Sequence, residues 1–138
     1  MKIESGYEEI THTADVSLRV WAPTLEQLFQ RAAEGMYDLM KLEILDMNSK
    51  LVIRKFHLEA IDDESLLVLF LSEILFIIEE KSLGFVKLDL QKTGPNLDVV
   101  MEGKTISSRY SDIKAVTFHE LKIKQVLDEY SVIIVFDT

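Results

Sequence analysis

Cysteine is absent from this sequence of 138 residues, and the five glycines are widely spaced. Without cysteine the chain can form neither a disulfide nor a thiolate metal site, which excludes zinc ribbons and cysteine nucleophiles. The phosphate-binding motifs G-x-x-x-x-G-K-[ST] and G-x-G-x-x-G are missing, as are G-x-S-x-G and H-E-x-x-H. Because no set of acid, base and nucleophile can be assembled, we expect a protein that is not itself an enzyme.

Basic residues are also scarce. The chain has 15 lysines and arginines against 24 aspartates and glutamates, which gives a formal net charge of −9. Such a charge repels the phosphate backbone of nucleic acids, so strong direct binding to RNA or DNA is not expected. A basic surface of another protein, or a divalent cation, is a more natural partner. The opening residues "MKIESGYEEI" lack the apolar core of a signal peptide, so we expect a cytoplasmic protein.

Two periodicities predict the secondary structure. Apolar residues at helical spacing, each run preceded by a capping residue, predict helices over about 24–40 and 63–81. Alternation predicts strands at 7–10, 16–21, 50–59, 85–90, 97–102, 113–119, 121–127 and 130–136, with a helix stop at Gly84, a polar loop over 103–112 and a hairpin turn at Asp128 and Glu129. Strands joined by hairpins, with two inserted helices, indicate a mainly antiparallel α+β fold in one domain, 1–138.

The second predicted helix is apolar on nearly every side. Between Leu66 and Ile78 only Ser72 and Glu73 are not apolar. A helix of this kind has to be covered on both sides, which favours a three-layer β/α/β sandwich. A membrane span would need about 20 apolar residues. Because Glu73 interrupts this shorter run, we expect no membrane association.

Two aspartates stand at the ends of predicted strands. Asp15 directly precedes the strand at 16–21, and Asp137 follows the last strand, next to Thr138. If those strands are antiparallel neighbours, the two carboxylates lie side by side and repel each other unless a proton or cation lies between them. Oxygen-only ligands favour Ca²⁺, Mg²⁺ or Mn²⁺. The alternative is that Asp15 bonds its own turn and that Asp137 is a solvated terminal residue.

Three further residues are candidates for a function. His12 could be a metal ligand or proton carrier, or could only hydrogen-bond its turn. Lys114 is the lone cation at the start of an apolar, alternating strand, where the alternative is a lysine that lies on the solvent face. His119 ends that predicted strand and has no stronger claim.

Four segments, in this order, resemble the archease family. They are "YEEITHTADVSLRVWAPTLEQLFQRAAEGMYDLM" at 7–40, "LLVLFLSEILFIIE" at 66–79, "IKAVTFHELKI" at 113–123 and the terminal "VIIVFDT". The first is similar to the family's pattern of a Tyr-Glu start, His-Thr-Ala-Asp, a strand, and a Thr-Leu-Glu helix. The resemblance extends over almost the whole chain.

The resemblance implies a β/α/β sandwich and a function in RNA processing. Archeases assist the RNA-splicing ligase RtcB in tRNA splicing by speeding its guanylylation with GTP and allowing multiple turnover, and some are associated with a tRNA methyltransferase. The family's divalent-cation site, a calcium site, corresponds here to Asp15, Asp137 and Thr138, with Mg²⁺ or Mn²⁺ as alternatives. Lys114 matches a functional lysine of the family. His12 and His119 match motif positions, and their roles stay open.

The chain departs from the family pattern in its second helix, where Leu69-Phe70 replaces the common Asp-Trp. Its last residue, Thr138, stands where an aliphatic residue is common. Two other functions compete with ligase activation. One is a general binding or chaperone-like module, which would need the apolar helix to be exposed. The other is a metal-dependent hydrolase acting at Asp15 and Asp137.

Overall fold

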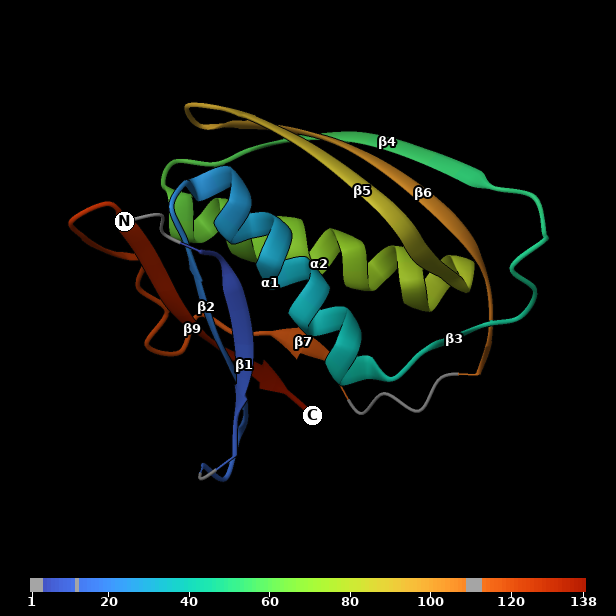
Figure 1. Ribbon diagram of the computed structural model, residues 1–138, viewed down its shortest axis with the longest axis horizontal. Helices are drawn as coiled ribbons and strands as arrows, with labels where there is room; N and C mark the ends of the chain where they lie inside the picture. The colour runs from blue at the N-terminus through green and yellow to red at the C-terminus, as the bar shows by residue number, and fades with distance from the viewer. Residues whose placement is uncertain (1–3, 12, 109–112) are drawn as a thin grey trace.

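Two antiparallel sheets lie on opposite sides of two helices in the computed structural model, which describes residues 4–11, 13–108 and 113–138 (Figure 1). The predicted α+β class and three-layer β/α/β arrangement are confirmed, and both helices lie where the sequence placed them. In chain order the elements are β1 (Gly6–Ile10), β2 (Val16–Ala22), α1 (Leu25–Met40), β3 (Glu43–Ile44), β4 (Val52–Glu59), α2 (Asp63–Lys81), β5 (Leu83–Thr93), β6 (Asn96–Ser108), β7 (Ala115–Val116), β8 (Lys124–Val126) and β9 (Glu129–Asp137).

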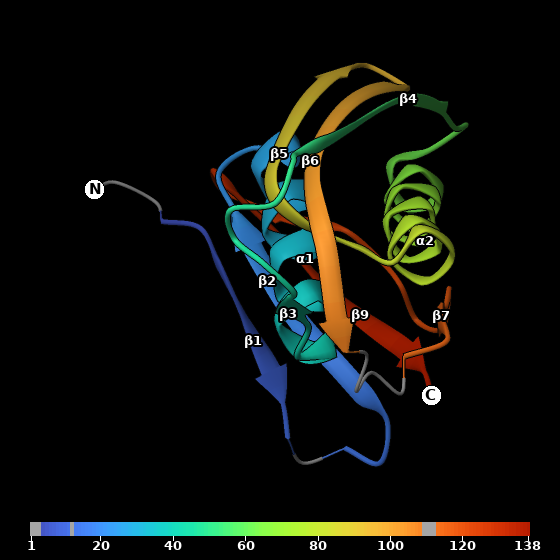
Figure 2. The same cartoon turned by 90° about the vertical axis from the view of Figure 1, so that its right-hand side faces the viewer.

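The first sheet runs in the order β1-β2-β9-β7, with β8 also paired to β9. In the second sheet β6 lies between its neighbours and pairs with β3, β4 and β5. Helix α1 contacts β1 and β2 of the first sheet and β5 of the second, and α2 contacts β7 of the first and β4 and β5 of the second. Figure 2 shows the two helices between the two sheets. The apolar core therefore fills the helical layer and the two sheet faces that enclose it.

Helix α1 begins at the capping residue that the sequence suggested, Thr24. The Thr24 hydroxyl accepts a hydrogen bond of 3.1 Å from the backbone N–H of Gln27, as an N-cap does. The buried face includes Gly35, where an added Cβ would lie 2.5 Å from Cδ2 of Leu18 on β2. A side chain at this position would clash with the side chains of Leu18 and Tyr7, so glycine permits the close approach of the helix to the sheet.

Helix α2 begins after Asp62, whose carboxylate accepts a hydrogen bond of 2.7 Å from the Ser65 N–H. That hydrogen bond lowers the pKa of Asp62. The helix ends at Ser82, which takes a left-handed φ of 53°, so the predicted stop at Gly84 is wrong; Gly84 belongs to β5. None of the helices in the described ranges is both long and apolar enough to cross a membrane.

Most of the apolar surface of α2 is covered, as the sequence predicted. Leu69 and Phe76, one on each side of the helix midpoint, are the exceptions, with 44% and 54% of their surface exposed. Phe70 is fully buried and its ring lies 6.0 Å from that of Phe29 on α1. The fully or nearly buried residues of the helix are Leu66, Leu67, Val68, Phe70, Leu71, Ile74, Leu75, Ile77 and Ile78.

Strand β6 is longer than the sequence predicted, because it continues to Ser108 through the first part of the predicted polar loop. The remainder of that loop, 109–112, lies outside the described residues. Both edges of β6 are occupied in this region, since Thr105 pairs with Leu83 and Ile106 pairs with Ile44 of the unpredicted strand β3. Pairing with two neighbours therefore outweighs the polar composition of this segment.

The predicted strands at 113–119 and 121–127 are mostly wrong, because only Ala115–Val116 and Lys124–Val126 pair with β9. Between them the Thr117 N–H still donates to the Val135 carbonyl oxygen at 3.0 Å, and a turn then follows at His119 and Glu120. The Thr117 hydroxyl accepts a hydrogen bond of 3.2 Å from the His119 N–H, and Glu120 takes a left-handed φ of 52°. The predicted hairpin between β8 and β9 is confirmed, with its turn at Leu127 and Asp128, one residue early.

Candidate functional site

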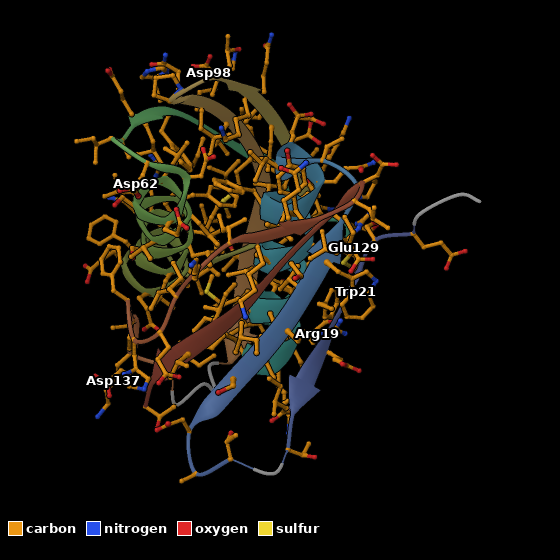
Figure 3. The ribbon with its side chains drawn as sticks, turned by 90° about the vertical axis from the view of Figure 1, so that its left-hand side faces the viewer. Arg19, Trp21, Asp62, Asp98, Glu129 and Asp137 are labelled. Carbon is orange, nitrogen blue, oxygen red and sulfur yellow. The ribbon has the colours of Figure 1, made fainter. Side chains whose placement is uncertain are left out.

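The start of β2 and the end of β9 lie side by side in the first sheet. The two strands are antiparallel, and their last paired residues at this end are Val16 and Phe136. Asp15 is the residue before Val16 and Asp137 is the residue after Phe136, and both side chains are exposed. Figure 3 shows Asp137 at one end of β9 and Glu129 at the other. The predicted condition for bringing the two aspartates together, antiparallel neighbouring strands, is therefore met.

Strand β7 brings Lys114 to the same end of the sheet. Ala115 is opposite Asp137 in the β7-β9 ladder, and the Lys114 N–H donates a hydrogen bond of 2.8 Å to the Asp137 carbonyl oxygen. The side chain of Lys114 is exposed, as is that of Thr138, the residue after Asp137. We refer to Asp15, Lys114, Asp137 and Thr138 as the strand-end site.

Apart from the Lys114 ammonium, the polar side-chain groups of the strand-end site are oxygens, which are the atoms that could ligate a metal ion. Two carboxylates and the oxygens of Thr138 suit a hard cation of the Ca²⁺ or Mg²⁺ kind, and suit thiophilic metals poorly. Across residues 4–11, 13–108 and 113–138, no group of three or more His, Asp or Glu side chains could hold a metal ion. A cation here would consequently need backbone oxygens, water or a partner's groups to complete its coordination.

The turn before β2 is stabilised by a residue other than the candidate ligand. The Thr13 hydroxyl donates a hydrogen bond of 2.8 Å to the Asp15 carbonyl oxygen, which fixes the backbone of Asp15. His12 lies outside the described residues. His119 is described and exposed, and it lines a separate pocket on the outer side of the same sheet. Of the predicted candidates, the structure therefore brings Asp15, Lys114, Asp137 and Thr138 to one end of the sheet.

This outer-sheet pocket has a volume of about 490 Å³. It lies where β7 and β8 pair with β9 only at 136–137 and 129–131, along the edge opposite β2, and where the chain between β7 and β8 forms a turn at 119–120. In the sequence Lys122 and Lys124 alternate with Leu121 and Ile123, a pattern that predicts a strand and does not indicate a pocket. The lining residues are Arg19, His119, Glu120, Lys122, Lys124, Ser131, Val132, Ile133 and Val135.

Comparison with known sequences identifies the family. Residues 7–138 match the model of the archease protein family. The chain belongs to the archease family. It is 32% identical over 130 residues to an archease of Thermococcus kodakarensis, an alignment that covers 88% of this chain and 90% of the relative. An archease of Pyrococcus abyssi is 30% identical over 132 residues, with the same coverage.

Solved structures support the archease fold. A crystal structure of an archease from Thermotoga maritima, described as a possible chaperone, aligns with a TM-score of 0.69 and 22% identity over 95% of this chain and 96% of that one. The solution structure of a Methanobacterium thermoautotrophicum protein aligns with a TM-score of 0.65 and 24% identity over 96% and 99% of the two chains. At these identities the likeness concerns the fold alone.

The structure explains one departure from the archease pattern. Where many family members have Asp-Trp in the second helix, this chain has Leu69-Phe70. Phe70 takes the buried position and packs on Phe29, so an aromatic ring fills the core there. Leu69 takes the exposed position, which places an apolar residue on the surface where a carboxylate is common.

Proposed function

We propose that this archease-family chain activates the RNA-splicing ligase RtcB in tRNA splicing, promoting its guanylylation by GTP and multiple turnover. The observation that carries the proposal is the β2-β9 register, which places Asp15 and Asp137 just beyond the pair Val16 and Phe136 in a chain of this family. The chain acts as a non-catalytic accessory protein, and a divalent cation, Ca²⁺ in first place, binds at the strand-end site.

The electrostatics of the two proteins support this partnership. A ligase that binds RNA and GTP must present basic groups to phosphates, and the chain carries a net charge of −9 with exposed carboxylates at the strand-end site. Complementary charge speeds association and fixes the orientation of docking. Lys114 supplies the one positive side chain of the site, and its ammonium can contact a carboxylate of the ligase or a phosphate oxygen bound there.

The cation has a physical role at this end of the sheet. Two neighbouring carboxylates repel each other, and a divalent ion between them removes the repulsion and ties the end of β9 to the start of β2. The chain's own contribution is to hold Asp137 in place, since its carbonyl oxygen accepts the hydrogen bond from the Lys114 N–H. The ligase would then meet a rigid surface instead of a frayed strand end.

The test is a guanylylation assay with purified RtcB, GTP and a divalent metal, with and without this chain. We expect more guanylylated ligase per unit time and several ligated RNA molecules per ligase. If the wild-type chain changes neither quantity, the proposed function is wrong. The same preparation, incubated with phosphoesters and Mn²⁺ or Ca²⁺ in the absence of ligase, tests the hydrolase alternative, for which turnover would have to be seen.

A chaperone-like or general binding module, including modulation of a tRNA methyltransferase, is the second candidate. Exposed Leu69 and Phe76 on α2 favour it, because they offer apolar surface to a partner. The burial of most of α2 counts against it, since the helix as a whole is not available. Suppression of client aggregation that is lost in Leu69→Gln and kept in Asp137→Asn would support this candidate over ligase activation.

A further inference from the structure

A second site lies on the outer face of the first sheet, away from the strand-end site. We infer that the outer-sheet pocket binds a small phosphate ester, with its phosphates on Arg19, Lys122 and Lys124 and its organic part on Ile133 and Val135. This site is independent of the proposed function and uses none of the residues of the strand-end site. Its ligand class follows from charge, size and the kinds of side chain that line it.

The charge of the pocket is opposite to that of the chain. Arg19, Lys122 and Lys124 are positive and Glu120 is negative, so the lining carries a net charge of +2 (three minus one) with His119 neutral. The whole chain carries −9. A local positive field in an acidic protein selects anions at that one place, because the surrounding surface repels them.

Arg19 is held ready for an anion by its neighbours on the sheet. Its guanidinium carbon lies 5.0 Å from the centroid of the Trp21 ring, a cation-π arrangement. Trp21 is itself packed over Gly6, where an added Cβ would lie 2.7 Å from the ring atom Cζ2. Figure 3 shows Arg19 and Trp21 one after the other along β2. A guanidinium positioned in this way loses little freedom when it binds a phosphate in its planar fork.

Glu8 competes for the same guanidinium. Its carboxylate lies 3.3 Å from Nη1 of Arg19, and the two side chains are 58% and 44% exposed. Exposed ion pairs of this kind contribute little stability, so a phosphate that brings more charge can displace Glu8 from Arg19. This competition gives the proposal a variant that should strengthen binding instead of weakening it.

The size and floor of the pocket favour a small organic phosphate over a nucleic acid. A volume of about 490 Å³ lies in the range of small-molecule sites, which is roughly 300–1,000 Å³. Ile133 lies opposite Arg19 in the β2-β9 ladder and has 47% of its surface exposed, so it offers apolar surface next to the cation. A polynucleotide would continue past the pocket onto the acidic remainder of the chain and be repelled.

The experiment measures binding of adenosine diphosphate, inorganic pyrophosphate and adenosine by isothermal titration calorimetry in the presence of a chelator. Trp21 is the only tryptophan, so its fluorescence reports whether the ligand reaches Arg19. We expect adenosine diphosphate to bind with a Kd below about 1 mM, pyrophosphate to bind more weakly, and adenosine more weakly still. Each binding ligand should also change the Trp21 emission.

Variants locate the site. Lys122→Gln and Lys124→Gln should each lower the affinity for adenosine diphosphate about tenfold, which is the effect of losing one charge-assisted hydrogen bond. Glu8→Gln should raise the affinity for adenosine diphosphate, because it removes the carboxylate that competes for Arg19. Lys55→Gln, which removes an exposed lysine from β4 in the other sheet, is the matched control and should bind as wild type does.

The outcomes separate this inference from the proposed function. No heat and no fluorescence change with any ligand would overturn it, as would equal affinity in wild type and both pocket lysine variants. Tighter binding of a single-stranded oligonucleotide than of adenosine diphosphate would overturn the assignment to a small ligand. Asp137→Asn should leave adenosine diphosphate binding unchanged, so ligase activation and pocket binding can fail or succeed separately.

Discussion

The backbone N–H of Lys114 donates a hydrogen bond of 2.8 Å to the carbonyl oxygen of Asp137. This contact joins the short strand β7 to the last residue of β9, and the β2-β9 register puts Asp15 on the opposite side of Asp137. Three segments that are far apart in the sequence thus meet at one end of a sheet. The chemistry proposed for this archease-family chain depends on that convergence.

Calcium should stabilise the folded chain through Asp15 and Asp137. A ligand that binds only the folded state adds about 2.7 kcal/mol to the free energy of unfolding at 100 times its Kd. We expect Asp15→Asn and Asp137→Asn each to lower the affinity for Ca²⁺ by about tenfold or more. Thermal unfolding with Ca²⁺ and with a chelator measures both effects.

Asp128→Asn is the matched control for the calcium prediction, because Asp128 is exposed in the turn at the other end of β9. It should respond to Ca²⁺ as wild type does. With a chelator present, Asp15→Asn and Asp137→Asn should be at least as stable as wild type, since each removes one of two neighbouring like charges. A loss of stability in the chelator would mean that the carboxylates have a structural role instead.

Lys92 ties the end of β5 to the start of α2. Its ammonium lies 2.8 Å from Oδ1 of Asp63 and donates to the Gly94 carbonyl oxygen at 2.7 Å, and its side chain is only 9% exposed. Lys92→Met should lower the free energy of unfolding by about 1–3 kcal/mol, because the partners of a largely buried cation are left without it. Urea denaturation measures the change.

The control for Lys92 is Lys87→Met on the same strand. Lys87 and Asp89 are 3.7 Å apart and about equally exposed, at 62% and 60%. An exposed pair of this kind contributes about 0–1 kcal/mol. Equal destabilisation by the two substitutions would show that burial of Lys92 does not determine its contribution.

His57 gives the stability a pH dependence. Its Nδ1 lies 2.7 Å from Oδ1 of Asp98, and this hydrogen bond raises the pKa of His57 above its usual 6.5. A raised pKa means that the folded chain holds the proton more tightly than the unfolded chain. The stabilisation is therefore complete below about pH 6.5 and is lost as the pH rises through the folded-state pKa.

Asp98→Asn should remove most of this pH dependence, because the hydrogen bond to Asp98 is the largest cause of the raised pKa of His57. The difference in stability between wild type and Asp98→Asn should be largest at mildly acidic pH, where His57 is protonated, and should shrink as the pH rises past neutrality. Titration of the His57 ring by NMR should give a lower pKa in the variant. Asp89→Asn, an exposed aspartate on β5, should leave the His57 titration as it is in wild type.

Two adjacent residues of α2 should respond very differently to substitution. Phe70→Ala should lower the free energy of unfolding by about 3–5 kcal/mol, because it opens a cavity between α2 and α1. Leu69→Gln should cost about 1 kcal/mol or less, since Leu69 is 44% exposed. Chemical denaturation of both variants measures the contrast, and comparable losses would contradict the burial of only one face here.

The layered fold could be predicted from the sequence because its signals are local. Helix α2 is apolar on nearly all sides, and such a helix requires cover on both sides wherever it lies. Thr24 and Asp62 cap their helices through their own side chains, so the helix starts could be read directly. The Asp15 and Asp137 pairing needed one further assumption, that β2 and β9 are antiparallel neighbours, and that is observed.

The errors arose where pairing or backbone geometry is decided by distant residues. The extension of β6 depends on β3 and β5, which lie elsewhere in the sequence. The composition of 103–108 alone does not predict a strand there. The turn at His119 and Glu120 breaks an apolar alternation that resembles a continuous strand. That break leaves room for the outer-sheet pocket, so the pocket was missed together with the turn.

The most direct measurement is the initial rate of RtcB guanylylation by GTP with equal amounts of wild type, Asp137→Asn and Asp128→Asn. We predict that wild type and Asp128→Asn accelerate the reaction equally and that Asp137→Asn, while folded to the same extent, loses most of the acceleration. Full acceleration by Asp137→Asn would contradict the assignment of the strand-end site. No acceleration by the wild-type chain would contradict the proposed function itself.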